Sequence, residues 1–171
     1  MHPDKVISDV KGDEFVAAVA ENHPSLTKIH LDGCKDVSDE GLAKLIQKCG
    51  TLHPNDIVSK HKGDKFLFAV DEFRKDLTEI NVRGCKAASD AGLAALVAGC
   101  PNLAPDKILS AVKGDMFCQA VAKHRPDLES LDLGKFKGEW DPVVLGFERC
   151  NEKLIKLDGK ENNHFASYTG R

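Results

Sequence analysis

Six cysteines and seven histidines are the residues of this 171-residue chain best suited to metal binding or catalysis. Zinc sites usually draw ligands from a Cys-x-x-Cys pair or a close Cys/His cluster, and the sequence shows neither pattern. Cys34 and Cys85 lie 51 residues apart, as do Cys49 and Cys100. We therefore interpret the cysteines as small buried residues at repeated positions, and the sequence implies no metal or other cofactor.

His30 is the histidine best placed for acid–base chemistry, because Lys28 and Asp32 flank it at alternate positions. Nucleophilic catalysis would also need a serine or cysteine beside the histidine. None stands there, since Cys34 is expected to be buried. The sequence therefore does not predict an enzyme.

Composition excludes several classes of protein. The formal net charge is −3, 42% of the residues are hydrophobic and 30% are charged. A disordered chain would have fewer apolar residues or a larger net charge. The nearly balanced charge argues against a nucleic acid partner, and no apolar stretch approaches the roughly 20 residues of a membrane-spanning helix.

The chain repeats itself every 51 residues, as Pro3, Pro54 and Pro105 show, and the third copy is faithful until about Leu133. One half of each unit begins LTKIHL from Leu26, where apolar residues alternate as in a strand with one buried face. Apolar residues at helical spacing follow, and the Ser-Asp pair at 38–39 before them is suited to cap a helix.

The other half of the unit carries a Lys-Gly-Asp triplet, which we expect to be a turn followed by a helix capped by the aspartate, Asp13 in the first copy. A phosphate-binding loop would need more glycines and a following Lys-Ser/Thr. The start of this half, Pro54 to Val58 in the second copy, is consistent with a short strand or a short helix. We favour the strand, which would bring Ile7, Val58 and Leu109 to the same face as His30.

These motifs resemble leucine-rich repeats. The pattern Leu-x-x-Ile-x-Leu-x-Gly-Cys-x-x-Val-Ser-Asp-x-Gly-Leu is similar to the cysteine-containing subtype of F-box proteins, and Lys-Gly-Asp-x-Phe-x-x-Ala-Val is more similar to the repeats of ribonuclease inhibitor and tropomodulin. The resemblance covers about residues 2–158. It implies an α/β solenoid, a short curved arc with a parallel β-sheet on the concave face and helices on the convex face. No F-box sequence is present, so a ligase role is not carried over.

Stacking would bury the apolar face that one strand-and-helix coil of about 25 residues cannot bury alone. Six coils, beginning near residues 3, 26, 52, 77, 103 and 128, would form a solenoid over residues 1–158. Leu154 and Leu157 would add an edge strand, and residues 159–171 would form a C-terminal cap or a frayed tail. The open ends of the stack would permit weak self-association.

In such a stack Cys34 and Cys85 would lie two strands apart, or about 9–10 Å. A disulfide requires Cα atoms within about 7 Å. Free thiols indicate a reducing compartment, the cytoplasm or the nucleus.

The outward residues of the concave sheet are the candidate functional residues, because they differ between copies while the framework stays the same. Concave solenoid faces commonly bind partners, so we predict noncatalytic recognition of another protein, as a scaffold or adaptor. Trp140 is of a type enriched in binding hot spots, with packing in the terminal coil as the alternative. The predicted partner-binding residues are Lys28, His30, Asp32, Glu79, Asn81, Arg83, Glu129, Asp132 and Trp140.

Two other functions remain consistent with the sequence. The chain could be the substrate-recognition arm of a ubiquitin-ligase complex whose other domain lies on another chain. It could also be a structural subunit of a larger assembly.

The predicted register is testable at Leu31. Truncation of a core leucine removes buried apolar surface and leaves a cavity, so Leu31→Ala should lower the free energy of unfolding by about 2–5 kcal/mol. Urea denaturation measures this change. A loss below about 0.5 kcal/mol, the range of surface substitutions, would show that Leu31 does not face the core.

Overall fold

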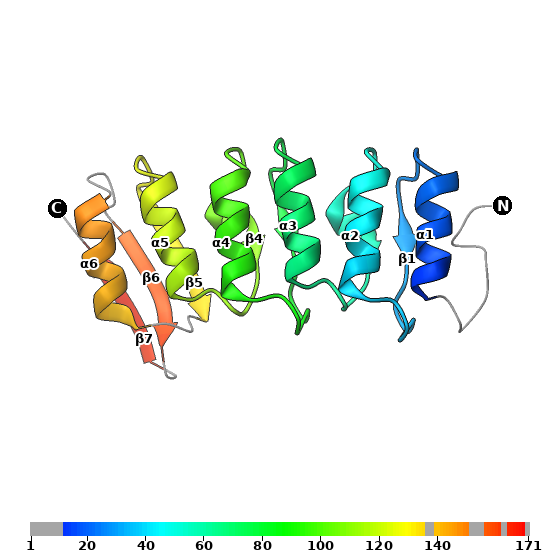
Figure 1. Ribbon diagram of the computed structural model, residues 1–171. Coiled ribbons are helices and arrows are strands. Elements are labelled where there is room, and N and C mark those ends of the chain that lie inside the picture. Colours follow the sequence, from blue (N-terminus) through cyan, green and yellow to red (C-terminus); the bar gives the residue numbers. More distant parts are fainter. Residues whose placement is uncertain (1–11, 136–138, 151–155, 162–163, 170–171) are drawn as a thin grey trace.

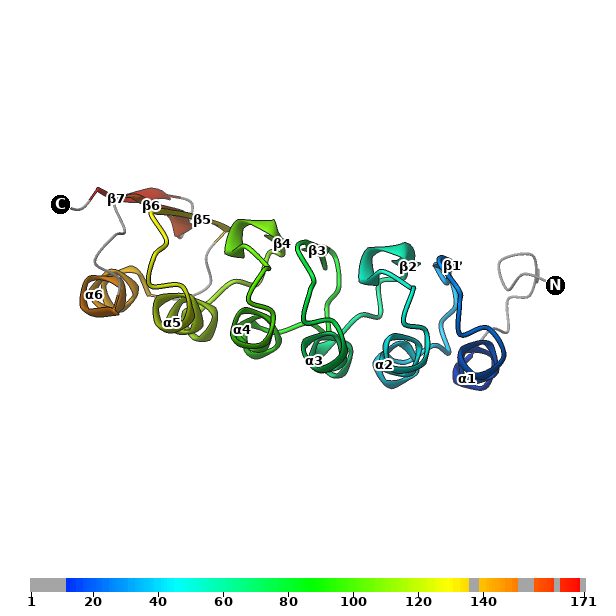
Figure 2. The same cartoon turned by 90° about the horizontal axis from the view of Figure 1, so that it is seen from above.

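The computed structural model describes residues 12–135, 139–150, 156–161 and 164–169. In these residues short strands alternate with six α-helices, so the protein has a mixed α/β structure (Figure 1). The helices lie in one row in chain order, each packed on the next, and the strands line the opposite side of the row (Figure 2). We call that side the strand face. The helices are α1 (Asp13–Asn22), α2 (Asp39–Lys48), α3 (Asp64–Phe73), α4 (Asp90–Gly99), α5 (Asp115–His124) and α6 (Trp140–Cys150).

The core lies between the helices and the strands. Leu42, Leu45 and Ile46 of α2 are fully buried, as their helical spacing predicts. The framework residues Leu26 and Leu31 are buried as well, and one apolar cluster runs through the row. Each coil therefore completes its core on its neighbours. None of the described helices is both long enough and apolar enough to cross a membrane.

The strands pair mainly in parallel. Ile29 is in register with Ile57, Ile80 with Ile108, and Leu131 with Leu157. Leu157 therefore belongs to a strand, as the sequence predicts, but not to an edge strand, because β6 pairs in parallel with β5 on one side and antiparallel with β7 on the other. Leu154 lies outside the described residues. The strands are β1 (Ile29–His30), β2 (Ile57–Val58), β3 (Ile80–Asn81), β4 (Ile108–Leu109), β5 (Ser130–Lys135), β6 (Lys156–Glu161) and β7 (His164–Thr169).

A single continuous sheet is not formed in the described part of the chain. The strands make three separate sheets, β1–β2, β3–β4 and β5–β6–β7. The expected parallel pairing is correct within each coil pair, but the sheet is interrupted between β2 and β3 and between β4 and β5. The expected boundary between the repeats and the C-terminal segment, at residues 158 and 159, lies inside β6.

The sheet is interrupted at the segments that begin with Pro54 and Pro105. Each segment contains a short helical turn followed by a short strand, so the helix and the strand predicted as alternatives are both present. Pro54 opens a 3₁₀ turn, η2 (Pro54–Asp56), before β2, and Pro105 opens η3 (Pro105–Lys107) before β4. Where a strand would present a backbone carbonyl, the Asn55 side-chain Oδ1 accepts the Asn81 N–H at 2.8 Å. The Asp106 carboxylate accepts the Asp132 N–H of β5 in the same way. The equivalent segment at Pro3, with Ile7, lies outside the described residues.

A series of aspartates joins the helix N-termini, and we call it the aspartate ladder. Each member is the first residue of its helix and accepts backbone N–H bonds from the start of the next coil. The Asp39 carboxylate, for example, accepts from Gly63 at 2.8 Å, Lys65 at 2.9 Å and Phe66 at 2.8 Å. Each coil thus satisfies the helix start of its neighbour. The ladder comprises Asp13, Asp39, Asp64, Asp90 and Asp115.

The predicted cap at Asp13 is therefore wrong in detail. Gly12 occupies the N-cap position and no side chain caps α1 from within its own coil. Asp13 instead accepts the Ser38 N–H of the next coil at 2.7 Å. The glycine of the Lys-Gly-Asp triplet lets a carboxylate of the preceding coil come close to the backbone. A Cβ on Gly63 would lie 2.5 Å from an Asp39 carboxylate oxygen. Ser38 is the N-cap of α2, as predicted, and accepts from the Gly41 N–H.

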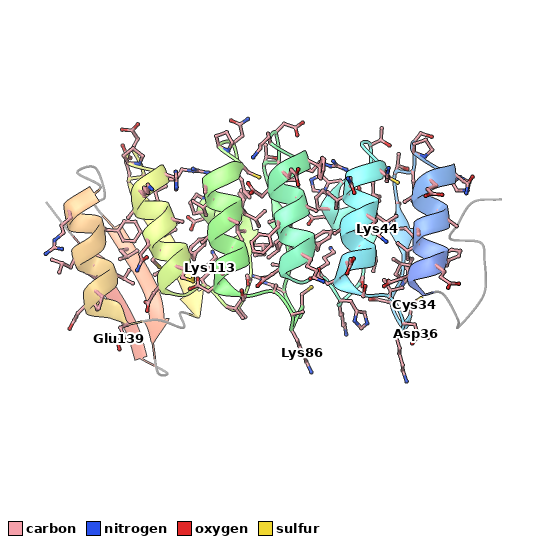
Figure 3. The ribbon with its side chains drawn as sticks, viewed as in Figure 1. Cys34, Asp36, Lys44, Lys86, Lys113 and Glu139 are labelled. Atoms are coloured by element: carbon pink, nitrogen blue, oxygen red, sulfur yellow. The ribbon has the colours of Figure 1, made fainter. Side chains whose placement is uncertain are left out.

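Removal of one ladder carboxylate should destabilise the whole stack. We expect Asp39→Ala to lower the free energy of unfolding by about 1–3 kcal/mol, because three N–H groups at the start of α3 lose a charged acceptor. Chemical denaturation measures the loss. The control is Asp36→Ala, an exposed aspartate in the turn before α2 (Figure 3). Equal stability of the two variants would contradict a structural role for the ladder.

Candidate functional site: two pockets on the strand face

The strand face carries the side chains that the sequence analysis selected as functional. In β1 Ile29 is buried and His30 exposed, and β3 repeats this with Ile80 and Asn81. The other selected residues of these strand regions, from Lys28 to Asp132, are exposed too. Val58 and Leu109 are half-buried and stand in register with His30 and Asn81, so both reach this face, as the strand interpretation predicts.

The cysteines are buried framework residues in the part of the chain that the structure describes. Cys34, Cys49, Cys85, Cys100 and Cys118 are free and buried, and burial raises the pKa of the Cys100 thiol to about 11. The Cys100 thiol is thus a poor nucleophile at neutral pH. Among the described residues no group of His, Cys, Asp and Glu could hold a metal ion. The side chain of Cys150 lies outside the described residues.

Two equivalent pockets open on the strand face, one for each interruption of the sheet. The Lys62 pocket, about 280 Å³, is lined by Asn55 and Asn81, which join β2 to β3. The Lys113 pocket, about 250 Å³, is lined by their counterparts Asp106 and Asp132. The side-chain links that replace backbone pairing therefore also shape the two depressions.

A buried lysine forms part of each pocket. Only 4% of Lys62 and 5% of Lys113 is exposed. The Lys113 ammonium donates to the Pro105 carbonyl at 3.2 Å and lies 5.2 Å from the centre of the Phe117 ring. The Lys62 ammonium lies 5.6 Å from the centre of the Phe66 ring.

Burial lowers the pKa of both lysines, because it penalises the charged ammonium. At Lys62 the Cys85 thiol opposes that effect most, followed by the carboxylates of Asp32 and Asp56. Asp106 and Asp132 oppose it at Lys113. Negative charge near either ammonium thus offsets part of the cost of its burial.

The structure brings together only some of the residues selected from the sequence. Asp32, Asn81 and Arg83 line the Lys62 pocket, and Arg83 and Asp132 line the Lys113 pocket. Lys28, His30 and Glu79 are exposed on the same face but line neither pocket.

The structure adds detail for Glu129, Trp140 and His30. Glu129 precedes β5, and Ser130 is the residue 51 positions after Glu79, so Ser130 holds the matching place on the face. Trp140 opens α6, which lies in the row of helices, and its side chain is outside the described residues. The His30 ring and the Asp32 carboxylate are 4.0 Å apart and well exposed, beyond hydrogen-bond distance.

Sequence reasoning missed the two buried lysines and the residues Asn55 and Asp106. The signal was present, because Lys11, Lys62 and Lys113 recur at the 51-residue step. The sequence alone favours a turn for the Lys-Gly-Asp triplet, because a lysine is rarely buried and the triplet has the composition of a loop. No protein-family model matches the chain.

The lowered lysine pKa values predict a specific dependence of stability on pH. Between its folded pKa and its ordinary value near about 10.4, each lysine binds fewer protons in the folded than in the unfolded state, so stability rises with pH. The unfolding free energy of the wild type minus that of Lys62→Met/Lys113→Met should therefore increase as pH rises toward 10.4.

Urea titrations at several alkaline pH values measure this difference. The matched control is Lys44→Met/Lys86→Met, which removes two exposed lysines (Figure 3). A difference that stays flat with pH, or one equal to that of the control, would contradict the assignment.

Proposed function

We propose that this chain is a leucine-rich-repeat solenoid whose strand face binds another protein, as a scaffold or adaptor. The observation that carries the proposal is the separation of constant and variable residues between copies. Leu26 and Leu77, like Cys34 and Cys85, are identical in two copies and buried. A repeated framework of buried residues is what stacking requires.

The variable positions lie on the strand face and change in charge. Lys28 is replaced one unit later by Glu79, and Asp32 by Arg83. All four side chains are exposed, so packing does not explain their differences. A surface that differs from copy to copy above a fixed framework is suited to recognise one extended partner at several points.

The strand face also mixes apolar and polar surface. Val58 and Leu109 are half-buried between charged neighbours. Protein interfaces combine an apolar centre with a polar rim in this way. Packing of each helix mainly on its neighbours in sequence supports the solenoid itself.

The proposal is tested by capture of partners from a lysate of the source cell. We expect proteins retained by the wild type to be lost with Lys28→Glu/Arg83→Glu, which reverses two charges on the strand face. The control Lys44→Glu/Lys86→Glu makes the same change in net charge away from the two pockets (Figure 3). It should retain the same proteins.

Circular dichroism and melting of all three proteins must first agree, so that loss of folding is not mistaken for loss of binding. Retention of the same proteins by both double variants would overturn the strand face as the binding surface. A ligase adaptor among the captured proteins would favour the substrate-recognition arm of a ubiquitin ligase.

A further inference from the structure

The two pockets occupy equivalent positions of the repeat but differ in electrostatic character. Positions 55 and 81 are asparagines in the Lys62 pocket, and the matching positions 106 and 132 are aspartates in the Lys113 pocket. Both versions accept the same backbone bond, since Asn55 holds the Asn81 N–H and Asp106 holds the Asp132 N–H at 3.1 Å. The charge at these positions is therefore not needed for the fold.

The exchange of asparagine for aspartate changes the net charge of the pocket lining. Lys60, Lys62 and Arg83 line the first pocket against the single carboxylate of Asp32. In the second, Arg83 and Lys113 face the two carboxylates of Asp106 and Asp132. The Lys113 pocket is thus neutralised from within, whereas the Lys62 pocket has an excess of positive charge.

The Lys62 ammonium shows the same imbalance. The Lys62 side chain is almost completely buried and its ammonium lies over the Phe66 ring, whereas the Lys113 ammonium donates to a carbonyl. Burial penalises an ammonium, so a ligand that brings an opposite charge to it is favoured. The pocket has room for such a group beside the apolar wall of Val58.

We propose that the Lys62 pocket binds the carboxylate side chain of an acidic segment of the partner protein. This inference rests on the proposed function, because the pocket opens on the strand face. The carboxylate pairs with the Lys62 ammonium, Arg83 lies on the pocket wall, and the methylene groups of a glutamate contact Val58.

The lining favours a carboxylate over a phosphate or a nucleic acid. The N–H groups at the start of α3, which would suit a phosphate, are already occupied by Asp39. The pocket is lined by no aromatic side chain on which a base could stack.

The test uses the complete chain and a capped heptapeptide of alternating glycine and glutamate, with a glutamine peptide as its uncharged counterpart. Binding is followed by NMR titration of the backbone amides of Asn81 and Cys85. We expect saturable binding of the glutamate peptide at millimolar concentration and binding about tenfold weaker or worse for the glutamine peptide.

The decisive variant is Asn55→Asp, which gives the Lys62 pocket the charge pattern of its own repeat copy. It keeps the oxygen that accepts the Asn81 N–H, so the fold should be retained, and affinity for the glutamate peptide should fall about tenfold or more. The control Asn102→Asp makes the same chemical change at an exposed position outside both pockets and should change affinity by less than about twofold.

Three results would overturn the proposal: no saturable binding of the glutamate peptide, equal binding of the glutamine peptide, or an Asn55→Asp variant that binds like the wild type. Tighter binding of inorganic phosphate at the same amides would replace the carboxylate by a phosphate group and overturn it as well. The proposed function is judged separately, because capture of partners by the Lys28→Glu/Arg83→Glu variant does not depend on the peptide.

Discussion

The hydrogen bonds from one coil to the helix start of the next are the constraint on which the rest of this structure depends. A helix leaves its first N–H groups without partners, and Asp39 and Asp90 accept such groups from α3 and α5. The other members accept the N–H of the residue just before the next helix. All of these carboxylates place negative charge near the positive ends of helix dipoles. The helices keep one orientation along the row, and Gly63 and Gly114 leave room for the Asp39 and Asp90 carboxylates.

A second consequence appears on the opposite side of the row. The helices fix the positions of the coils, so the strands need not form an unbroken sheet. A 3₁₀ turn replaces part of the strand before β2 and β4, and the side chains of Asn55 and Asp106 supply the missing acceptors. The strand face therefore contains two depressions with a buried lysine in each. Where backbone pairing is replaced by a side chain, the identity of that side chain is free to set the local charge.

The residues that stay constant between copies and the residues that differ therefore occupy different positions of the same unit. Buried apolar residues and the ladder aspartates are constant because stacking needs them in every copy. Exposed residues of the strand face are under no such constraint. Copies that share a backbone thus present Lys28 against Glu79 and Asn55 against Asp106. A short array of this kind can offer a partner several different contacts without any change of fold.

The sequence by itself determined the repeat, the helices, the parallel strands and the buried cysteines, because apolar spacing and the 51-residue step are local signals that stacking only reinforces. It also identified Asp32, Asn81, Arg83 and Asp132 as surface residues. Only the tertiary structure decided that Asp13 serves the next helix rather than its own, that Asn55 interrupts the sheet, and that Lys62 and Lys113 are buried. These features depend on which residue of a neighbouring coil comes within hydrogen-bond distance. That proximity is set by the packing of one coil on another, and the recurrence of these residues along the chain does not reveal it.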